Sequence, residues 1–263
     1  GAVERLRQIG YLGEGESRIG VAYDKAAYIK YDYPPPDDEI KKHLEIANLI
    51  AAIEGDIRPG RRSLDIGSAT GRNPRQLSAL GLEAFGIDIE EAAVQYASAE
   101  SLARKSADVC FVVGDGALLP FGDCTIGILT CMMGTFAHLE RGAQRQMIKE
   151  ARRIVEPDGV LVISTWDPEC PFLSFLSMYA ESEKELIRQN SRSMRDIVGM
   201  AGELGWGRVA TRRFDLIPTV FSYELGLQRL SAEDLLRLIE IDIAVQALYP
   251  DKPGQMYQII ARP

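Results

Sequence analysis

Short apolar runs alternate along this chain with segments in which apolar residues recur every three or four positions. The runs predict buried strands, and the wider spacing predicts amphipathic helices. We expect strands at Arg62–Gly67, Glu83–Asp88, Val109–Gly114, Ile126–Met132 and Val160–Thr165. We expect helices between them at Asn73–Leu80, Glu90–Ala103 and Arg141–Val155. Strands separated by helices favour an α/β fold, in which a parallel sheet carries helices on both faces.

The same periodicity predicts further elements on either side of this alternation. A helix is expected over Asp37–Gly55, where Asp37 can cap the first turn and Gly55 can end the last. Later we expect a helix opened by Ser193 that ends near Gly205, a sixth strand at Arg208–Ile217, a long helix opened by Ser231 and a last strand at Met256–Ala261. The predicted sheet therefore has seven strands, most of them parallel.

Three segments are expected to cover this sheet. Residues 1–36 are rich in tyrosine and end in three prolines, which exclude a continuous helix, so we interpret them as a lid. Residues 37–263 then form one domain. Within it, residues 166–192 and 221–250 are candidates for covering a pocket; a helix packed on the core is the alternative for the first.

Composition and charge narrow the class of partner. The chain is 46% hydrophobic and 26% charged, with a net charge of -8. Nucleic acid is disfavoured because its binding relies on basic patches. We find no apolar run long enough to span a membrane and no signal peptide. The four cysteines lack paired metal-ligand spacing, so we expect reduced thiols, no metal site and a cytoplasmic protein.

The first strand of the alternation leads into a glycine-containing turn. Gly67 and Gly71 allow the backbone to approach a ligand closely, and Asn73-Pro74 is expected to cap and start the next helix. The unpaired N–H groups at a helix start attract anionic and polar groups. The turn therefore predicts a site for a small charged molecule; an ordinary strand-to-helix connection is the alternative.

Acidic residues lie at the ends of three successive strands, where ligands bind in parallel sheets. They are Asp65, Asp88 and Asp115. A carboxylate about 20 residues after a glycine-rich turn can accept hydrogen bonds from a ribose diol, so Asp88 indicates a nucleoside. Asp115 can accept from an exocyclic amine such as that of adenine. The middle glycine of the usual dinucleotide pattern is missing between Gly67 and Gly71, which argues against a nicotinamide cofactor.

With these motifs assembled, the sequence resembles the class I S-adenosylmethionine-dependent methyltransferases. The motifs that carry the resemblance are Leu64–Gly71, Gly86–Ile89, Gly114–Phe121 and Ala151–Ile163. The resemblance implies a Rossmann-like methyltransferase sheet, S-adenosyl-L-methionine as cofactor and S-adenosyl-L-homocysteine as product. Two residues depart from the family pattern: Ile126-Gly127 stands in place of a Phe-Asp pair, and Asp158 in place of a glycine. We expect both to concern local stability more than activity.

The resemblance also implies roles for individual residues. Gly67 and Gly71 would approach the methionine portion of the cofactor, and Asp65 would hold its ammonium group directly or through water. Asp88 would bind the ribose hydroxyls, and Asp115 would accept from the adenine amine. The other implied contacts are Gly116, Ala117 and Ile89 around the base, and Met132 and Met133 near the sulfonium.

The reaction itself needs an acceptor held in line with the methyl group, and a base helps an oxygen or nitrogen acceptor to lose its proton. His138, in the loop after the fourth strand, is the candidate base, with a structural role as its alternative. The chain lacks an Asn/Asp-Pro-Pro-Tyr motif, and no proline precedes Cys131, which disfavours methylation of nucleic-acid bases. Arg72 either meets the cofactor carboxylate or faces solvent.

We therefore expect transfer of the methyl group of S-adenosylmethionine to an oxygen or nitrogen of a small organic acceptor, such as a secondary metabolite. Two alternatives stay open. One is a methyltransferase-like scaffold that binds the cofactor, and the other is a nicotinamide-dependent oxidoreductase. Neither nucleic acid nor a membrane is an expected partner. The helix opened by Ser231 either completes the pocket or forms the contact of a homodimer.

Overall fold

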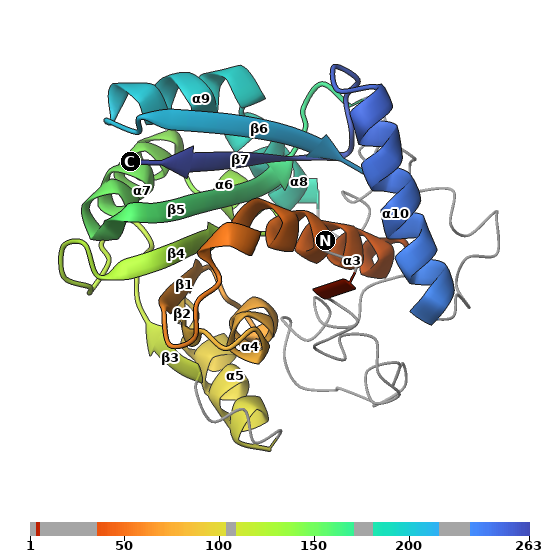
Figure 1. Ribbon diagram of the computed structural model, residues 1–263. Coiled ribbons are helices and arrows are strands. Elements are labelled where there is room, and N and C mark those ends of the chain that lie inside the picture. The colour runs from red at the N-terminus through yellow and green to blue at the C-terminus, as the bar shows by residue number, and fades with distance from the viewer. Residues whose placement is uncertain (1–3, 6–35, 104–108, 171–180, 216–231) are drawn as a thin grey trace.

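Seven strands form one sheet in the computed structural model, in the order β3-β2-β1-β4-β5-β7-β6 (Figure 1). They are β1 (Arg62–Ile66), β2 (Glu83–Asp88), β3 (Val109–Val113), β4 (Ile126–Cys131), β5 (Val155–Trp166), β6 (Arg208–Phe214) and β7 (Met256–Arg262). Strands β1 to β5 pair in parallel, whereas β7 runs antiparallel to both β5 and β6. The predicted α/β fold with a mostly parallel seven-stranded sheet is confirmed. The structure describes residues 4–5, 36–103, 109–170, 181–215 and 232–263.

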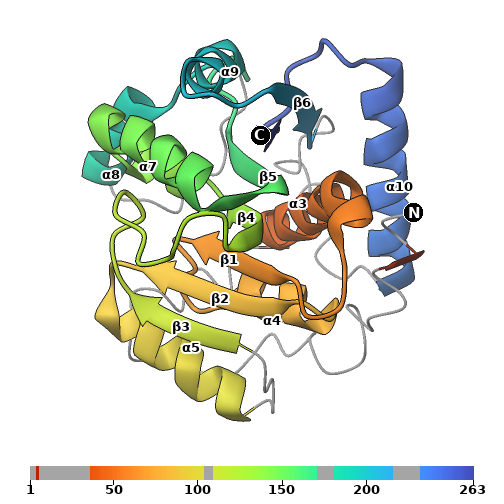
Figure 2. The same ribbon diagram turned by 60° about the vertical axis from the view of Figure 1, so that its left-hand side comes forward.

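Helices cover both faces of this sheet. They are α3 (Pro36–Ile53), α4 (Arg72–Ala79), α5 (Glu91–Ala103), α6 (Thr135–His138), α7 (Arg141–Ile154), α8 (Glu181–Asn190), α9 (Met194–Glu203) and α10 (Ala232–Leu248). One core packs apolar side chains of α3, α4 and α10 on the strands, among them Ile46, Leu77 and Ile239. The other packs α7 and α9, through residues such as Met147 and Ile197. Figure 2 shows α7 and α9 on one side of the sheet and α3 and α10 on the other.

Two predicted helix boundaries are wrong. Helix α4 begins at Arg72, after Gly71 in a left-handed conformation, and no side chain caps it. Asn73 is therefore no N-cap; it lies buried in the first turn, and its side chain hydrogen-bonds the Asp65 carboxylate. Gly55 does not end α3 either. The chain continues through a 3-10 turn over Glu54–Asp56, which brings Asp56 to Arg61 and Arg262.

The fifth strand starts at Val155, earlier than the predicted Val160. Its register with β4 shifts from Ile126 opposite Val155 to Ile128 opposite Val160, so the intervening residues bulge out of the ladder. Residues Pro157, Asp158 and Gly159 are therefore part of a bulged strand. Such bulges bend a strand and leave residues without a ladder partner.

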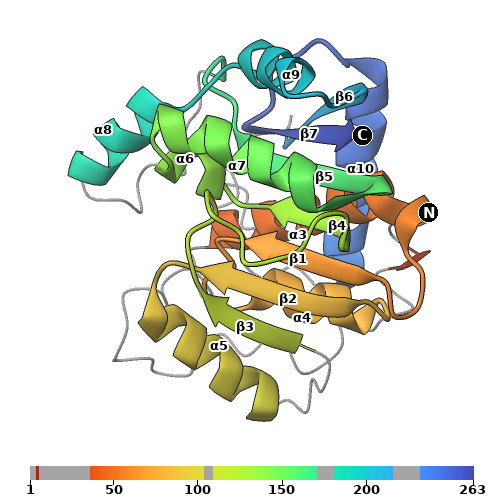
Figure 3. The ribbon, with the colours of Figure 1, turned by 90° about the vertical axis from the view of Figure 1, so that its left-hand side faces the viewer.

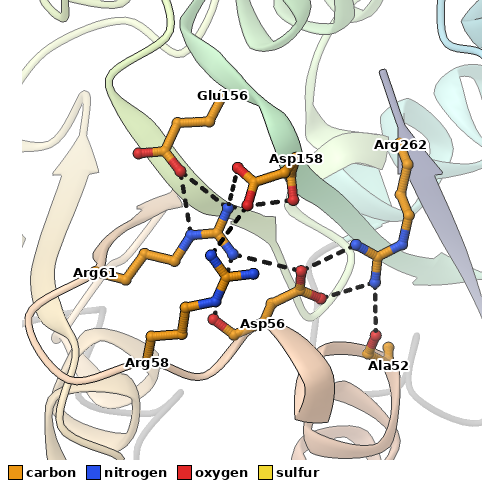
Figure 4. A network of polar contacts seen from close by, with 7 residues as sticks. All are labelled: Ala52, Asp56, Arg58, Arg61, Glu156, Asp158 and Arg262. Atoms are coloured by element: carbon orange, nitrogen blue, oxygen red, sulfur yellow. Dashed lines mark hydrogen bonds and ion pairs between the residues drawn. The ribbon is translucent and has the colours of Figure 1, made fainter.

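A network of ion pairs holds this bulge at the amino end of the parallel strands (Figure 4). The Nη2 atom of Arg61 lies 2.9 Å from Glu156 Oε2 and 2.9 Å from Asp158 Oδ1. Arg61 Nη1 lies 3.5 Å from Asp56 Oδ1, and Arg262 Nη2 lies 2.7 Å from Asp56 Oδ2. The network joins the end of α3, the start of β5 and the last residues of β7. It lies at the edge of the sheet opposite the predicted site.

The remaining elements follow the predictions closely. Ser193 caps α9, where its side chain accepts a hydrogen bond from the Asp196 N–H. Strand β6 ends at Phe214, because Asp215 leaves the extended conformation with a φ of 56°. The rest of the predicted continuation, residues 216–217, lies outside the described residues. The same is true of the tyrosine-rich lid apart from residues 4–5 and Pro36, which begins α3, and of residues 171–180 and 221–231 in the predicted covers.

Candidate functional site

The carboxyl ends of β1, β2, β3 and β4 meet at one edge of the sheet. Ile66 of β1 lies opposite Ile87 of β2 and Cys131 of β4, and Asp88 of β2 lies opposite Val113 of β3. Figure 3 shows β1, β2 and β3 side by side and pointing the same way. The sheet order changes direction at β1, which has β2 on one side and β4 on the other. Ligands of doubly wound sheets bind at such a switch point.

The turn after β1 is folded tightly against β2 and against the loop after β4. The N–H groups of Gly67 and Ser68 donate to Ile87 O at 2.8 and 3.1 Å. Gly67 and Gly71 have φ angles of 70° and 84°, and Ala69 has one of 44°. A Cβ atom on Gly67 would overlap the Thr135 side chain. Glycine at this position therefore allows two loops at the switch point to touch.

Asp65, one of the predicted cofactor contacts, is buried at the end of β1. Its Oδ1 accepts a hydrogen bond of 2.6 Å from the Thr130 hydroxyl, and the side chain of Asn73 donates to it as well. Burial raises the pKa of Asp65 to about 7, while Thr130 and the nearby Arg72 oppose the shift. This carboxyl group therefore titrates near neutral pH, and a cation bound beside it would favour its charged form.

Asp88 joins the end of β2 to the glycine-containing turn. Its Oδ2 accepts from the Ala69 N–H at 2.7 Å, and its Oδ1 accepts from the Glu90 N–H at 3.0 Å. Each carboxylate oxygen has a second lone pair, so both can still accept from a ligand hydroxyl. The backbone bonds fix the carboxylate in place, which is what recognition of a diol requires.

Asp115 is exposed in the loop after β3, and its Oδ1 accepts from the Ala117 N–H at 2.8 Å. A Cβ atom on Gly116 would overlap Ile66 Cγ2, so this loop lies directly on the end of β1. Ile89, after β2, is 70% exposed. The structure thus leaves one carboxylate and one apolar side chain accessible at the ends of adjoining strands, a combination that suits a flat base with a polar edge.

The loop after β4 contains the residues predicted near the sulfonium. Met132 is 3% exposed and packs in the core beside α3, so its side chain is part of the core. Met133 is partly buried and has a φ of 50°, and Gly134 follows at 78°. His138, the candidate base, is exposed at the end of the one-turn helix α6.

Glu45 of α3 is a residue at this site that sequence reasoning missed. Its side chain is fully buried; Oε1 accepts from the Met133 N–H at 2.6 Å, and Oε2 lies 3.3 Å from Arg72 Nη2. Arg72 is consequently held inside the site, with a side chain 20% exposed, and does not simply face solvent.

Burial, Arg72 and Lys42 lower the pKa of His43 to about 4, which keeps that imidazole neutral at pH 7.

Two features of this edge fit a nucleoside that carries an amino-acid moiety. Asp88 and Asp115 offer acceptors at neighbouring strand ends. Among the described residues, the buried Nη1 atom of Arg72 has no hydrogen-bond acceptor. The donors and acceptors therefore match a ligand with hydroxyls, an amine and a carboxylate. No metal-binding group of His, Cys, Asp or Glu occurs in the described ranges.

Comparison with known proteins agrees with this geometry. Residues 64–159 match a family described as a methyltransferase domain. The uncharacterized methyltransferase YcgJ of Bacillus subtilis is 29% identical over 119 residues, which cover 45% of this chain and 46% of that protein. A demethylmenaquinone methyltransferase of Corynebacterium glutamicum is 25% identical over 179 residues, covering 62% and 72%. The matched part spans less than half the length of the first relative.

Solved structures show the same fold. A SAM-dependent methyltransferase from Aquifex aeolicus has a TM-score of 0.55 at 15% identity, covering 86% of this chain and 97% of that one. Phosphoethanolamine N-methyltransferase 2 from Haemonchus contortus, in complex with S-adenosyl-L-methionine, has a TM-score of 0.58 at 18% identity, covering 93% and 61%. The architecture is thus the Rossmann-like one of methyltransferases. Residues 64–159, which match the methyltransferase domain, make up this fold from β1 to the first part of β5.

Two further findings bear on the surroundings of the site. In the part of the chain that the structure describes, no helix is both long and apolar enough to cross a bilayer. All four cysteines are free; Cys110 and Cys124 are exposed, whereas Cys131 and Cys170 are buried. Burial and the nearby Asp65 and Glu45 raise the pKa of the Cys131 thiol, so this thiol at the end of β4 stays protonated.

Proposed function

We propose that this protein transfers the methyl group of S-adenosyl-L-methionine to an oxygen or nitrogen atom of a small organic acceptor, such as a secondary metabolite. One observation carries the proposal: the backbone-fixed Asp88 carboxylate lies at the switch point, beside a turn in which Gly67 leaves no room for a side chain. A nucleoside cofactor with an amino-acid portion meets acceptors and close backbone there.

Each predicted site residue has a place in this proposal. Asp88 holds the ribose hydroxyls, and Asp115 accepts from the adenine amine beside Ile89, Gly116 and Ala117. Asp65 holds the ammonium group, directly or through water, while Gly67 and Gly71 approach the methionine portion. The bound cofactor supplies an activated methyl group, and the chain's own task is to orient the acceptor and exclude water.

His138 is proposed as the base that removes the acceptor's proton. Its exposed position at the end of α6 leaves the imidazole accessible to an acceptor. Met133, in the same loop, lines the methyl-transfer end of the site, whereas the Met132 side chain supports that loop from the core. Residues 1–36, 166–192 and 221–250 are proposed as covers of the acceptor pocket over the methyltransferase domain of residues 37–263.

The partners follow from the same features. The acidic net charge of -8 supports a small-molecule acceptor over nucleic acid, and the free cysteines support a cytoplasmic protein. The proposed role of α10 is either to complete the acceptor pocket or to form the contact of a homodimer. Because three curated relatives carry the name demethylmenaquinone methyltransferase, demethylmenaquinone belongs among the acceptors to be tested.

The test is transfer of isotope-labelled methyl groups from S-adenosylmethionine to a panel of phenols, amines and quinols, followed by mass spectrometry. The proposal predicts one labelled product class that disappears in Asp88→Ala. Binding of the cofactor without product from any acceptor would favour the scaffold alternative. A change in NADH fluorescence on mixing, without binding of S-adenosylhomocysteine, would favour the oxidoreductase.

A further inference from the structure

One carboxylate from α3 reaches two separate parts of the site. Glu45 is fully buried, and its two oxygens have different partners. Oε1 accepts from the Met133 N–H in the loop after β4, and Oε2 pairs with Arg72 in the first turn after the β1 loop. A single side chain therefore connects the two loops on either side of the switch point.

Packing alone does not explain a charged residue at this position. The neighbouring residues Leu44, Ile46 and Leu49 are buried in an apolar core, where a leucine at position 45 would need no charge partner. Burying a carboxylate costs several kcal/mol unless it is paired and hydrogen-bonded. Replacing such a buried pair by apolar residues is often neutral or stabilising. The carboxylate is therefore better explained by what it holds than by stability.

The two groups held by Glu45 are both placed for ligand contact. Met133 and Gly134 both adopt left-handed φ angles, which few non-glycine residues do. The bond to the Met133 N–H fixes this bend, and Thr135 just after it touches Gly67. Arg72 turns one nitrogen toward Glu45, and its buried Nη1 finds no acceptor in the described ranges. A donor of this kind suits an anionic ligand group.

We propose that Glu45 is a positioning residue for the cofactor's methionine end, which it serves by orienting Arg72 and the Met133 loop. The inference rests on the proposed function, because it assumes a cofactor between these loops. Glu45 acts through Arg72 and the Met133 backbone and touches no reacting atom. Glu45→Gln removes the negative charge that pairs with Arg72. The side-chain oxygen of the glutamine can still accept a hydrogen bond from the Met133 N–H.

The test compares Glu45→Gln, Arg72→Gln and the double variant by calorimetry with S-adenosylhomocysteine and by steady-state kinetics. We expect Glu45→Gln to raise the Kd about tenfold and the KM for S-adenosylmethionine in parallel, with kcat changed less than threefold. The double variant should bind no worse than Arg72→Gln, because both substitutions remove one interaction. It also removes both charges, so it serves as the test if Glu45→Gln does not fold.

Asp56→Asn is the matched control. Asp56 is also a buried carboxylate paired with arginines, but it lies at the opposite edge of the sheet. Asp56→Asn should lower the melting temperature of the protein and leave the Kd of S-adenosylhomocysteine unchanged. A wild-type Kd in Glu45→Gln, or a double variant that binds tenfold worse than Arg72→Gln, overturns the inference. Absence of binding by the wild-type protein would instead overturn the proposed function.

Discussion

Gly127 leaves the space that the Arg61 side chain fills. A Cβ atom at position 127 would overlap Cγ, Cδ and Nε of Arg61. The guanidinium beyond them lies 2.9 Å from Asp158 Oδ1. Position 127 usually carries an acid in the family that the sequence resembles, and position 158 usually carries glycine. The two departures are therefore linked, because both accommodate one buried arginine.

This linkage predicts non-additive effects on stability. Gly127→Ala should displace Arg61 from Glu156 and Asp158 and lower the free energy of unfolding by about 1–3 kcal/mol, the usual cost of overpacking. Arg61→Ala should cost a similar amount, and adding Gly127→Ala to it should cost little more, since the clash is gone. Urea unfolding of the four proteins measures the coupling. Strictly additive losses would contradict the linkage.

Gly67→Ala should damage both stability and binding. The new Cβ overlaps Thr135, and the φ of 70° is unfavourable for alanine by roughly 1–2 kcal/mol. Thr135→Ala removes the overlapping atoms but not the backbone cost, so the double variant should recover only part of the loss. Thermal unfolding measures this. A double variant as stable as Thr135→Ala alone would show that the left-handed backbone carries no cost.

The raised pKa of Asp65 predicts a pH dependence for the protein without ligand. The folded state binds a proton to Asp65 up to pH of about 7, whereas the unfolded chain releases it near the ordinary value of 3.8. The unfolded state therefore binds fewer protons in this window, and the free energy of unfolding falls as pH rises from about 4 to about 7. Asp65→Asn should remove that slope in urea unfolding at several pH values.

Ligand binding should show the opposite trend. A bound ammonium group needs the charged carboxylate, so below pH of about 7 binding must expel a proton from Asp65. We expect the Kd of S-adenosylhomocysteine to rise by up to about tenfold per pH unit below 7 and to level off above it. Calorimetry in buffers of different ionisation enthalpy would detect the proton release. A Kd that is constant from pH 5.5 to 8 would exclude an ionic role for Asp65.

His138→Ala tests the proposed base. General base catalysis contributes about 10²–10⁴-fold, so kcat should fall by at least a hundredfold while the Kd of S-adenosylhomocysteine stays unchanged. His138→Gln provides a control of similar size that cannot accept the proton. If either variant keeps most of the turnover, His138 is not the base.

Much of this arrangement follows from local sequence patterns. The pattern of apolar runs predicted strand ends at Gly67, Asp88 and Met132. The observed ends, Ile66, Asp88 and Cys131, lie within one residue of them. The three acidic residues Asp65, Asp88 and Asp115 were therefore predicted at the correct edge of the sheet. The prediction that Asn73 caps α4 was wrong. The Asn73 side chain hydrogen-bonds the Asp65 carboxylate instead, and no local sequence pattern shows that these two side chains meet.

Glu45 could not be predicted because its partners come from other elements. It lies 27 residues before Arg72 and 88 before Met133, and a helical pattern records only which face is buried. The one available signal was a glutamate between the apolar residues Leu44 and Ile46. The bulge at Glu156–Gly159 was hidden for the same reason, since Arg61 holds it from another part of the chain.

Cofactor binding at the ends of β1 to β4 is tested most directly by calorimetric titration of S-adenosylhomocysteine into the wild-type protein and into Asp88→Ala. Asp88 accepts from the backbone at Ala69 and Glu90 and is proposed to hold the ribose hydroxyls. Asp115→Ala, on the neighbouring strand end, should weaken binding less, because its carboxylate is exposed. We expect one site with micromolar affinity in the wild type and no measurable heat of binding in a folded Asp88→Ala. Absence of binding by the wild type, or equal binding by a folded Asp88→Ala, would contradict it.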